Sequence, residues 1–317
     1  MLRIPLIAAA SVMLATAASA QTAKVSVTAI VEHPALDAVR DGVRDGLEEA
    51  GYTTGDNLDF TYESAQGNPA TAAQIAREFV GNAPDVIVPI STPSAQAAAA
   101  ATRDIPVVFS AVTDPETAGL VETIEEPGGN VTGVSDLTPI ADHVALMKEI
   151  VPEAENLGFV YNPGEANSVA LLTLFREAAE EQGLGVVEAP ANKSAEVQAA
   201  ARSLVGKADA MYVPTDNTIV SALEALVAVA EENDLPLFSG DTDSVERGAL
   251  ASVGFNYYEL GKVTAEVVLR VLEGEDPASI PVTFATGTDL FVNLKAAEAM
   301  GVSVPQEVTD RAAKIIE

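Results

Sequence analysis

The chain has 317 residues, 48% of them hydrophobic, and its 47 acidic against 17 basic side chains give a formal net charge of −30. A charge of this size repels nucleic acid and anionic lipid surfaces, and we exclude both as partners. The length suits two domains, and the apolar content is sufficient for two packed cores.

Residues 1–20 have the pattern of a secretory signal segment. Arg3 supplies a positive charge, an apolar run extends from Ile4 to Ala18, and small residues precede a cleavage site expected after Ala20. The run is shorter than the ~20 residues that a membrane-spanning helix needs. A lipid anchor would need a cysteine, and the chain contains none. We therefore expect export to the periplasm without a membrane anchor.

After the signal segment, short apolar runs alternate with alanine-rich amphipathic stretches. In chain order, strands are expected at Val25–Val31, Leu58–Glu63, Val86–Pro89, Val107–Ser110, Leu157–Tyr161, Gly185–Glu188, Ala210–Val213, Leu237–Ser239 and Ala251–Val253. Helices are expected between them at Leu36–Ala50, Ala70–Gly81, Ser94–Thr102, Pro139–Ile150, Asn167–Gln182, Ala195–Gly206, Thr218–Asn233 and Tyr258–Leu272. This alternation is typical of parallel sheets with crossover helices on both faces.

The two halves of the chain follow the same pattern. Residues 85–94 form a strand and a polar loop leading into a helix, and residues 105–114 begin with Ile-Pro, form a strand and end in a loop with an aspartate. Residues 209–218 and 235–243 repeat this order, with Leu-Pro in place of Ile-Pro. Two similar α/β lobes explain the repeat better than the alternative, which is one large doubly wound sheet.

Two glycine-containing segments, 127–133 and 247–254, are expected to carry the chain between the lobes. Several crossings make a hinge that bends while the lobes stay rigid. The predicted fold class is α/β, with two lobes whose parallel sheets are joined by a multi-strand hinge. The expected ranges are 24–134 plus 253–280 for the first lobe and 135–252 plus 281–317 for the second.

The loops expected at the carboxyl ends of the strands are small and polar, and ligands of open parallel sheets bind there. His33 follows the first strand, and Thr113 and Asp114 follow a later one. Ser94 and Ser168 lie near helix starts, where free N–H groups and the helix dipole suit a carboxylate. Helix capping is the alternative role for such residues.

Two aspartates, Asp216 and Asp241, occupy comparable loops of the second half. A carboxylate there can accept hydrogen bonds from an ammonium group, so the two halves together suit a zwitterion such as an amino acid. Turn formation is the alternative role for each aspartate. The chain has no tryptophan, on which sugar rings commonly stack, so a sugar is a less favoured ligand.

Motifs for catalysis and for cofactor binding are missing. His33 and His143 are the only histidines, and we find no Gly-x-Ser-x-Gly, no Gly-x-Gly-x-x-Gly after a strand and no P-loop. Zinc is not expected without cysteine. We expect no cofactor, no metal and no enzyme activity, with a periplasmic hydrolase as the alternative that has least support.

Several short motifs occur in the following order along the chain: His33-Pro-Ala-Leu-Asp, Thr92-Pro-Ser-Ala-Gln, Val112-Thr-Asp-Pro, Pro127-Gly-Gly-Asn-Val-Thr-Gly-Val, Tyr161-Asn-Pro-Gly-Glu-Ala-Asn-Ser, Pro214-Thr-Asp-Asn and Tyr258-Glu-Leu-Gly. Together they resemble the ABC-transporter substrate-binding proteins of the tryptophan/tyrosine type, from about Val25 to Val304. The resemblance implies a type I periplasmic-binding fold with two Rossmann-like lobes. It also implies a hydrophobic or aromatic amino acid as ligand and the membrane permease of an ABC transporter as partner.

By motif position, the resemblance implies that Thr92 and Ser94 hold the ligand from the first lobe. From the second lobe it implies contacts by Asn167, Ser168, Asp216, Asn217 and Asp241. His33, Thr113 and Asp114 complete the predicted ligand-binding set. A ligand-sensing module for a receptor would have the same fold, so that alternative stays open, as does a binder of another small polar solute such as a sugar.

Overall fold

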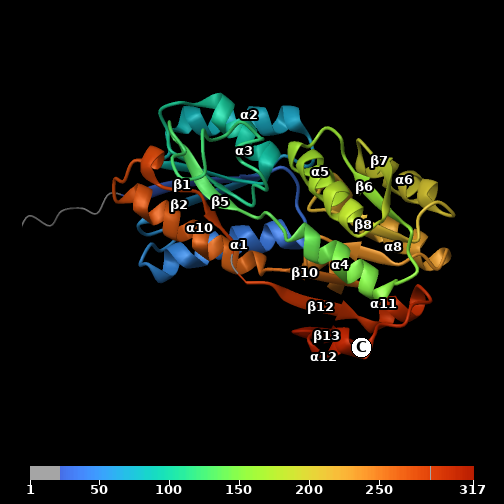
Figure 1. The fold of residues 1–317 in the computed structure, drawn as a ribbon. Helices are drawn as coiled ribbons and strands as arrows, with labels where there is room; N and C mark the ends of the chain where they lie inside the picture. Colours follow the sequence, from blue (N-terminus) through green and yellow to red (C-terminus); the bar gives the residue numbers. More distant parts are fainter. Residues whose placement is uncertain (1–21, 286) are drawn as a thin grey trace, which may run out of the picture.

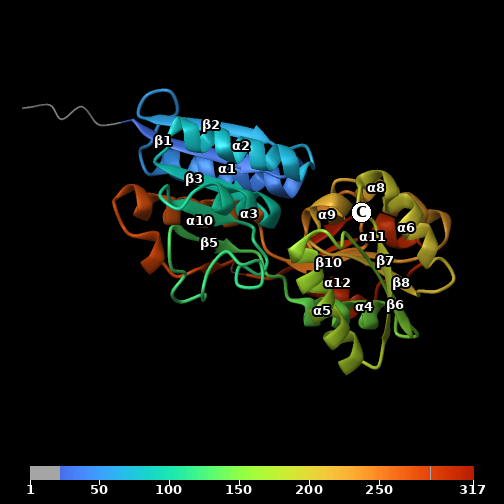
Figure 2. The same cartoon turned by 90° about the horizontal axis from the view of Figure 1, so that it is seen from above.

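The computed structural model describes residues 22–285 and 287–317, so the expected signal segment at residues 1–20 lies outside the described residues. The chain forms two lobes side by side, each built on its own sheet (Figures 1 and 2). Each lobe has a separate cluster of buried apolar side chains. The prediction of two Rossmann-like lobes with parallel sheets is therefore confirmed.

The sheet of the first lobe has the strand order β11-β5-β4-β3-β1-β2, and every pairing in it is parallel. Its strands are β1 (Ala23–Ala29), β2 (Leu58–Ser64), β3 (Val86–Ile90), β4 (Val107–Ser110), β5 (Val131–Ser135) and β11 (Thr283–Phe284). Helices α1 (Pro34–Glu49) and α10 (Tyr257–Leu272) pack together on one face. Helices α2 (Pro69–Asn82) and α3 (Thr92–Ala101) pack on the other, and a short 3₁₀ helix follows α10 at Pro277–Ser279.

The sheet of the second lobe has the order β13-β12-β10-β9-β8-β6-β7, in which only the β10–β12 pairing is antiparallel among the described residues. Its strands are β6 (Asn156–Tyr161), β7 (Gly185–Pro190), β8 (Ala210–Val213), β9 (Leu237–Ser239), β10 (Ala251–Gly254), β12 (Asp289–Asn293) and β13 (Lys314–Ile316). Its helices are α4 (Ile140–Ile150), α5 (Ala166–Glu181), α6 (Val197–Leu204) after a 3₁₀ turn at Ser194–Glu196, α7 (Asn217–Val220), α8 (Leu223–Glu232), α9 (Asp243–Glu246), α11 (Leu294–Ala299) and α12 (Gln306–Asp310). The order β7-β6-β8-β9-β10 repeats the order β2-β1-β3-β4-β5 of the first lobe.

The lobes exchange one helix each. Helix α4 follows β5 of the first lobe but packs against α5 of the second, and α10 follows β10 of the second lobe but packs against α1 of the first. In Figure 1 the orange α10 lies beside the blue α1. A Cβ added to Gly42 of α1 would lie 2.1 Å from the carbonyl oxygen of Tyr258, and one added to Gly261 would lie 2.3 Å from that of Val39. Glycine at both positions therefore permits this close helix contact.

The crossings lie slightly later in the chain than the glycine-containing segments indicate. Residues 127–133 lead into β5 and form part of it, and residues 251–254 form β10, so the chain passes between the lobes at 136–139 and at 255–256. A further passage, which the expected ranges place after residue 280, lies between β11 and β12. Sheet membership consequently differs from the expected lobe ranges, because Ser135 and β11 belong to the first sheet and residues 253–254 to the second.

Candidate functional site

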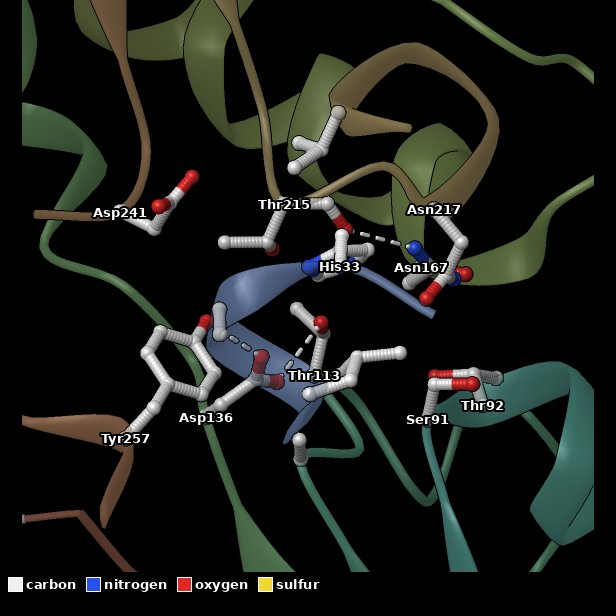
Figure 3. A pocket seen from close by; sticks show the side chains of 14 residues that line it. His33, Ser91, Thr92, Thr113, Asp136, Asn167, Thr215, Asn217, Asp241 and Tyr257 are labelled. Carbon is white, nitrogen blue, oxygen red and sulfur yellow. Dashed lines mark hydrogen bonds between the residues drawn. The ribbon is translucent and has the colours of Figure 1, made fainter. Parts of the chain in front are cut away.

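A cavity lies between the lobes at the carboxyl ends of the parallel strands (Figure 3). About 350 Å³ of empty space lies between its lining residues, and this figure includes space that is open to solvent. The first lobe lines it with His33, Ala35, Leu36, Ser91, Thr92, Ala111, Thr113, Asp136 and Tyr257, and the second lobe with Asn167, Thr215, Asn217, Val220 and Asp241. The lining therefore comes from the loops that follow β1, β3, β4, β5, β8 and β9 and from the first turns of α1, α3, α5, α7 and α10.

The cavity is lined by buried polar atoms that lack a partner. Nine buried side-chain oxygen or nitrogen atoms of the described residues have no hydrogen bond, and five of them belong to residues that line this cavity. These five are His33 Nδ1, Ser91 Oγ, Thr92 Oγ1, Asn167 Oδ1 and Thr215 Oγ1. Buried polar groups are normally hydrogen-bonded, and leaving one unpaired costs ~1–3 kcal/mol. Their concentration here indicates a site for a polar ligand that contacts both lobes.

Backbone strain marks the start of α3 beside the cavity. Ser91 precedes this helix with φ of 78°, a left-handed conformation that residues other than glycine rarely adopt. Ser91 and the following residue, Thr92, are also almost fully buried, with exposed fractions of 3% and 1%. Strain of this kind concentrates at ligand sites, where the surrounding structure holds the residue in place.

On the second lobe, a buried carboxylate orients two asparagine side chains. Glu165 accepts hydrogen bonds from Asn217 Nδ2 at 2.6 Å and from the backbone N–H groups of Asn217 and Thr218 at 3.1 and 3.0 Å. Asn167 Nδ2 donates to the carbonyl oxygen of Thr215 at 2.9 Å. Because a carboxylate and a carbonyl only accept, the two amide groups must direct Nδ2 toward them. The amide oxygens of Asn167 and Asn217 are left available to a ligand.

The opposite side of the cavity is acidic. Asp136, which directly follows β5, accepts hydrogen bonds from Thr113 Oγ1 at 3.0 Å and from the Tyr257 hydroxyl at 2.9 Å. Burial raises the pKa of Asp136 to about 6, against the effect of these two donors. Asp241 accepts from the backbone N–H and the hydroxyl of Ser244, both at 2.7 Å, and burial raises its pKa as well.

The histidine of the cavity is neutral. Burial, with a further contribution from the charge of Arg247, lowers the pKa of His33 to about 3. His33 precedes α1, and its Nδ1 atom is one of the buried atoms without a partner. No lysine or arginine occurs among the described residues that line the cavity. A ligand therefore meets hydroxyls, amides, an uncharged imidazole and two carboxyl groups.

Six of the ten predicted ligand-binding residues line the cavity: His33, Thr92, Thr113, Asn167, Asn217 and Asp241. The other four do not. Ser94 is buried within α3, and Asp114 accepts hydrogen bonds from the backbone N–H and the hydroxyl of Thr117. Contact with a ligand stays a prediction for all ten residues.

Asp216 and Ser168 belong to the support of the site rather than to its surface. The Asp216 carboxylate accepts hydrogen bonds from Asn162 N at 2.6 Å, from Ser168 Oγ at 2.6 Å and from Ile219 N, at the start of α7, at 2.9 Å. Its side chain is completely buried. Burial, and then the nearby charge of Glu165, raise the pKa of Asp216 to about 8. The position of Asp216 therefore does not support the hydrogen bond that we expected between its carboxylate and the ammonium group of a ligand.

Four polar residues of the lining are absent from the predicted set: Ser91, Asp136, Thr215 and Tyr257. Ser91 and Thr215 are direct neighbours of predicted residues in polar loops, which is a signal that could have found them. Asp136 follows β5, which the sequence pattern does not predict. Tyr257 begins α10, so its place beside the cavity depends on the exchange of helices between the lobes.

Among the described residues, no cluster of histidine, cysteine, aspartate and glutamate side chains is arranged to hold a metal ion. Over the same residues, no helix combines the length and the apolar character needed to cross a bilayer.

Two lobes that enclose a polar cavity at their strand ends are the fold of type I periplasmic binding proteins, and solved solute-binding proteins share it at 14–16% identity with TM-scores of 0.61 to 0.64. The chain belongs to the family described as ABC transporter substrate binding protein, whose model matches residues 24–316. The prediction from the sequence motifs is thereby confirmed.

Three relatives are informative about the site. The tyrosine-binding protein of Clostridioides difficile (strain R20291) is 42% identical over 276 residues, which cover 87% of this chain and 80% of that protein. A solved domain from Streptococcus pneumonia in complex with L-Trp is 35% identical, covers 93% of this chain and 100% of that one, and has a TM-score of 0.91. The ligand-free, open structure of an adhesive substrate binding protein from Clostridium difficile is 40% identical, covers 93% and 99% of the two chains, and has a TM-score of 0.70.

Proposed function

We propose that the protein is the periplasmic solute-binding protein of an ABC importer and that it binds a hydrophobic or aromatic amino acid between its two closing lobes. The observation that carries this proposal is the group of unpartnered buried polar atoms that faces one cavity from both lobes. A zwitterion would supply donors and acceptors to these atoms at once. The relatives that bind tyrosine and tryptophan support an aromatic amino acid as the ligand.

The relatives also support closure of the lobes as the mechanism. The chain superposes better on the L-Trp complex than on the open, ligand-free structure, although its sequence is more similar to the latter. A ligand that contacts both lobes stabilises the closed arrangement, and only its greater affinity for that arrangement can shift the equilibrium. The closed form would then dock on the permease. In this mechanism the protein releases its ligand unchanged, so it is not an enzyme.

A thermal-shift panel of all common L-amino acids and several sugars tests the proposal. A ligand at 100 times its Kd stabilises the folded protein by about 2.7 kcal/mol. At ~2–4 °C per kcal/mol, that corresponds to an increase in Tm of ~5–11 °C. We expect this increase with tyrosine, tryptophan or phenylalanine. An increase with sugars alone would refute the choice of ligand class.

A further inference from the structure

The polar groups of the cavity separate into two ends. We call Ser91, Thr92, Asn167 and Asn217 the neutral end, and Asp136, Asp241 and Tyr257 the acidic end. Figure 3 shows the two ends on opposite sides of the cavity, with Thr113 and His33 between them. The lining also includes apolar side chains, of which Leu36, Ala111 and Val220 are almost fully buried.

The two ends differ in how far the protein already satisfies them. At the neutral end, Ser91 Oγ, Thr92 Oγ1 and Asn167 Oδ1 have no partner. At the acidic end, both oxygens of Asp136 and both oxygens of Asp241 accept hydrogen bonds, and the Tyr257 hydroxyl donates one. The charged head group of an amino acid carries most of its polar atoms. At the neutral end, it would therefore give hydrogen-bond partners to the largest number of unpartnered buried atoms.

The neutral end also offers the correct kinds of partner on its two sides. The hydroxyls of Ser91 and Thr92 lie at the start of α3, where backbone N–H groups and the helix dipole favour a carboxylate. Across from them, the Asn167 and Asn217 amide oxygens, oriented by Thr215 and Glu165, can only accept, which suits an ammonium group. This arrangement suits an amino acid whose carboxylate faces one lobe and whose ammonium group faces the other.

A head group at the neutral end would direct the ligand side chain toward the acidic end, which lies on the opposite side of the cavity (Figure 3). A carboxylate has about four acceptor positions, so Asp136 keeps capacity for a further donor after bonding Thr113 and Tyr257. The hydroxyl of tyrosine and the indole N–H of tryptophan are such donors, and phenylalanine has none. Burial raises the pKa values of Asp136 and Asp241 because it disfavours their charged forms. A neutral hydrogen-bond donor can therefore suit this end, and a positively charged group is not required.

Building on the proposed function, we propose that Asp136 determines specificity by accepting a hydrogen bond from the distal donor of an aromatic side chain, while the neutral end holds the amino and carboxylate groups. Binding then selects tyrosine and tryptophan over phenylalanine, because only the first two supply a further donor to Asp136, in addition to Thr113 and Tyr257. Sites that hydrogen-bond a substrate hydroxyl discriminate strongly against the analogue that lacks it.

Calorimetric titration of the purified mature protein with the three aromatic amino acids tests this proposal. The variants are Asp136→Asn and, as a second change at the same end, Asp241→Asn. Asp85→Asn is the matched control, because Asp85 is exposed and precedes β3, at the opposite end of the sheet from the cavity. The melting temperature of each variant without ligand shows whether it is folded.

The wild type is expected to bind tyrosine or tryptophan at least tenfold more tightly than phenylalanine. Asp136→Asn should weaken tyrosine binding at least tenfold and phenylalanine binding less than threefold, and Asp85→Asn should change neither.

If Asp136→Asn does not fold, a selective loss of tyrosine binding in Asp241→Asn supports the proposal. Equal affinities of the wild type for tyrosine and phenylalanine would overturn it. An equal loss for all three ligands in the Asp136 or Asp241 variant would also overturn it, because the ammonium group would then bind at the acidic end. If no amino acid binds the wild type, it is the proposed function that fails.

Discussion

Replacement of Asp216 by alanine should destabilise the second lobe. The change removes the acceptor of three buried donors, Asn162 N, Ser168 Oγ and Ile219 N. Each unpaired buried donor costs ~1–3 kcal/mol. Loss of a carboxyl group whose charge is disfavoured by burial and by Glu165 acts in the opposite direction, so we take the lower value for each. The expected loss of unfolding free energy is then about 3 kcal/mol, the sum of three such losses.

At ~2–4 °C per kcal/mol, this loss lowers the Tm by ~6–12 °C in a thermal melt without ligand. Asp209→Ala is the control in the same lobe, because Asp209 accepts from the backbone N–H groups of Glu155 and Asn156 in an exposed position where water can replace it. Its Tm should fall by ~3 °C at most, since exposed interactions contribute little. An Asp216→Ala variant with the wild-type Tm but without ligand affinity would show that this carboxylate contacts the ligand and would refute the structural role.

Three further predictions concern titration, helix packing and closure. Because the folded pKa of Asp216 is raised to about 8, its contribution to stability is complete below ~4, the pKa of an unfolded aspartate, and is lost as the pH rises through about 8. The Tm of the wild type minus the Tm of Asp216→Asn should therefore be larger at pH 5 than at pH 8. A larger difference at pH 8 would contradict the raised pKa. Gly42→Ala places a Cβ against the Tyr258 carbonyl and should cost ~1–3 kcal/mol, whereas Gly81→Ala, with open space around it, should be neutral or stabilising in the same denaturant titration. A saturating aromatic amino acid should reduce the radius of gyration in small-angle scattering, and an unchanged radius would contradict closure.

Much of the fold could be predicted because most of its strands are short apolar runs between polar turns. The expected strands at Ala210–Val213 and Leu237–Ser239 agree with β8 and β9 at both ends. The helix expected at 218–233 is two helices, α7 and α8, with a break at residues 221–222. A continuous apolar pattern across the break gave no signal of it.

The site could be predicted less completely, and the reasons are physical. β5 follows two glycines and contains Gly133, where a Cβ would lie 2.1 Å from the Phe109 carbonyl oxygen, so the segment resembles a flexible connection. Without that strand, Asp136 cannot be placed at a strand end. Asp216 was expected in the cavity because a helix-capping aspartate and a ligand-binding aspartate occupy the same sequence position, and only its three hydrogen-bond partners separate the two roles.

The exchange of α4 and α10 has a consequence for the way the chain acquires its structure. The first lobe needs α10 and β11, which are encoded after most of the second lobe, to cover the face of α1 that carries Gly42. A fragment that ends at residue 135 would leave that face in water, so the amino-terminal half should not be stable when produced alone. Contacts between such distant parts of a chain form slowly. Completion of the first lobe must therefore wait until nearly the whole polypeptide has been synthesised.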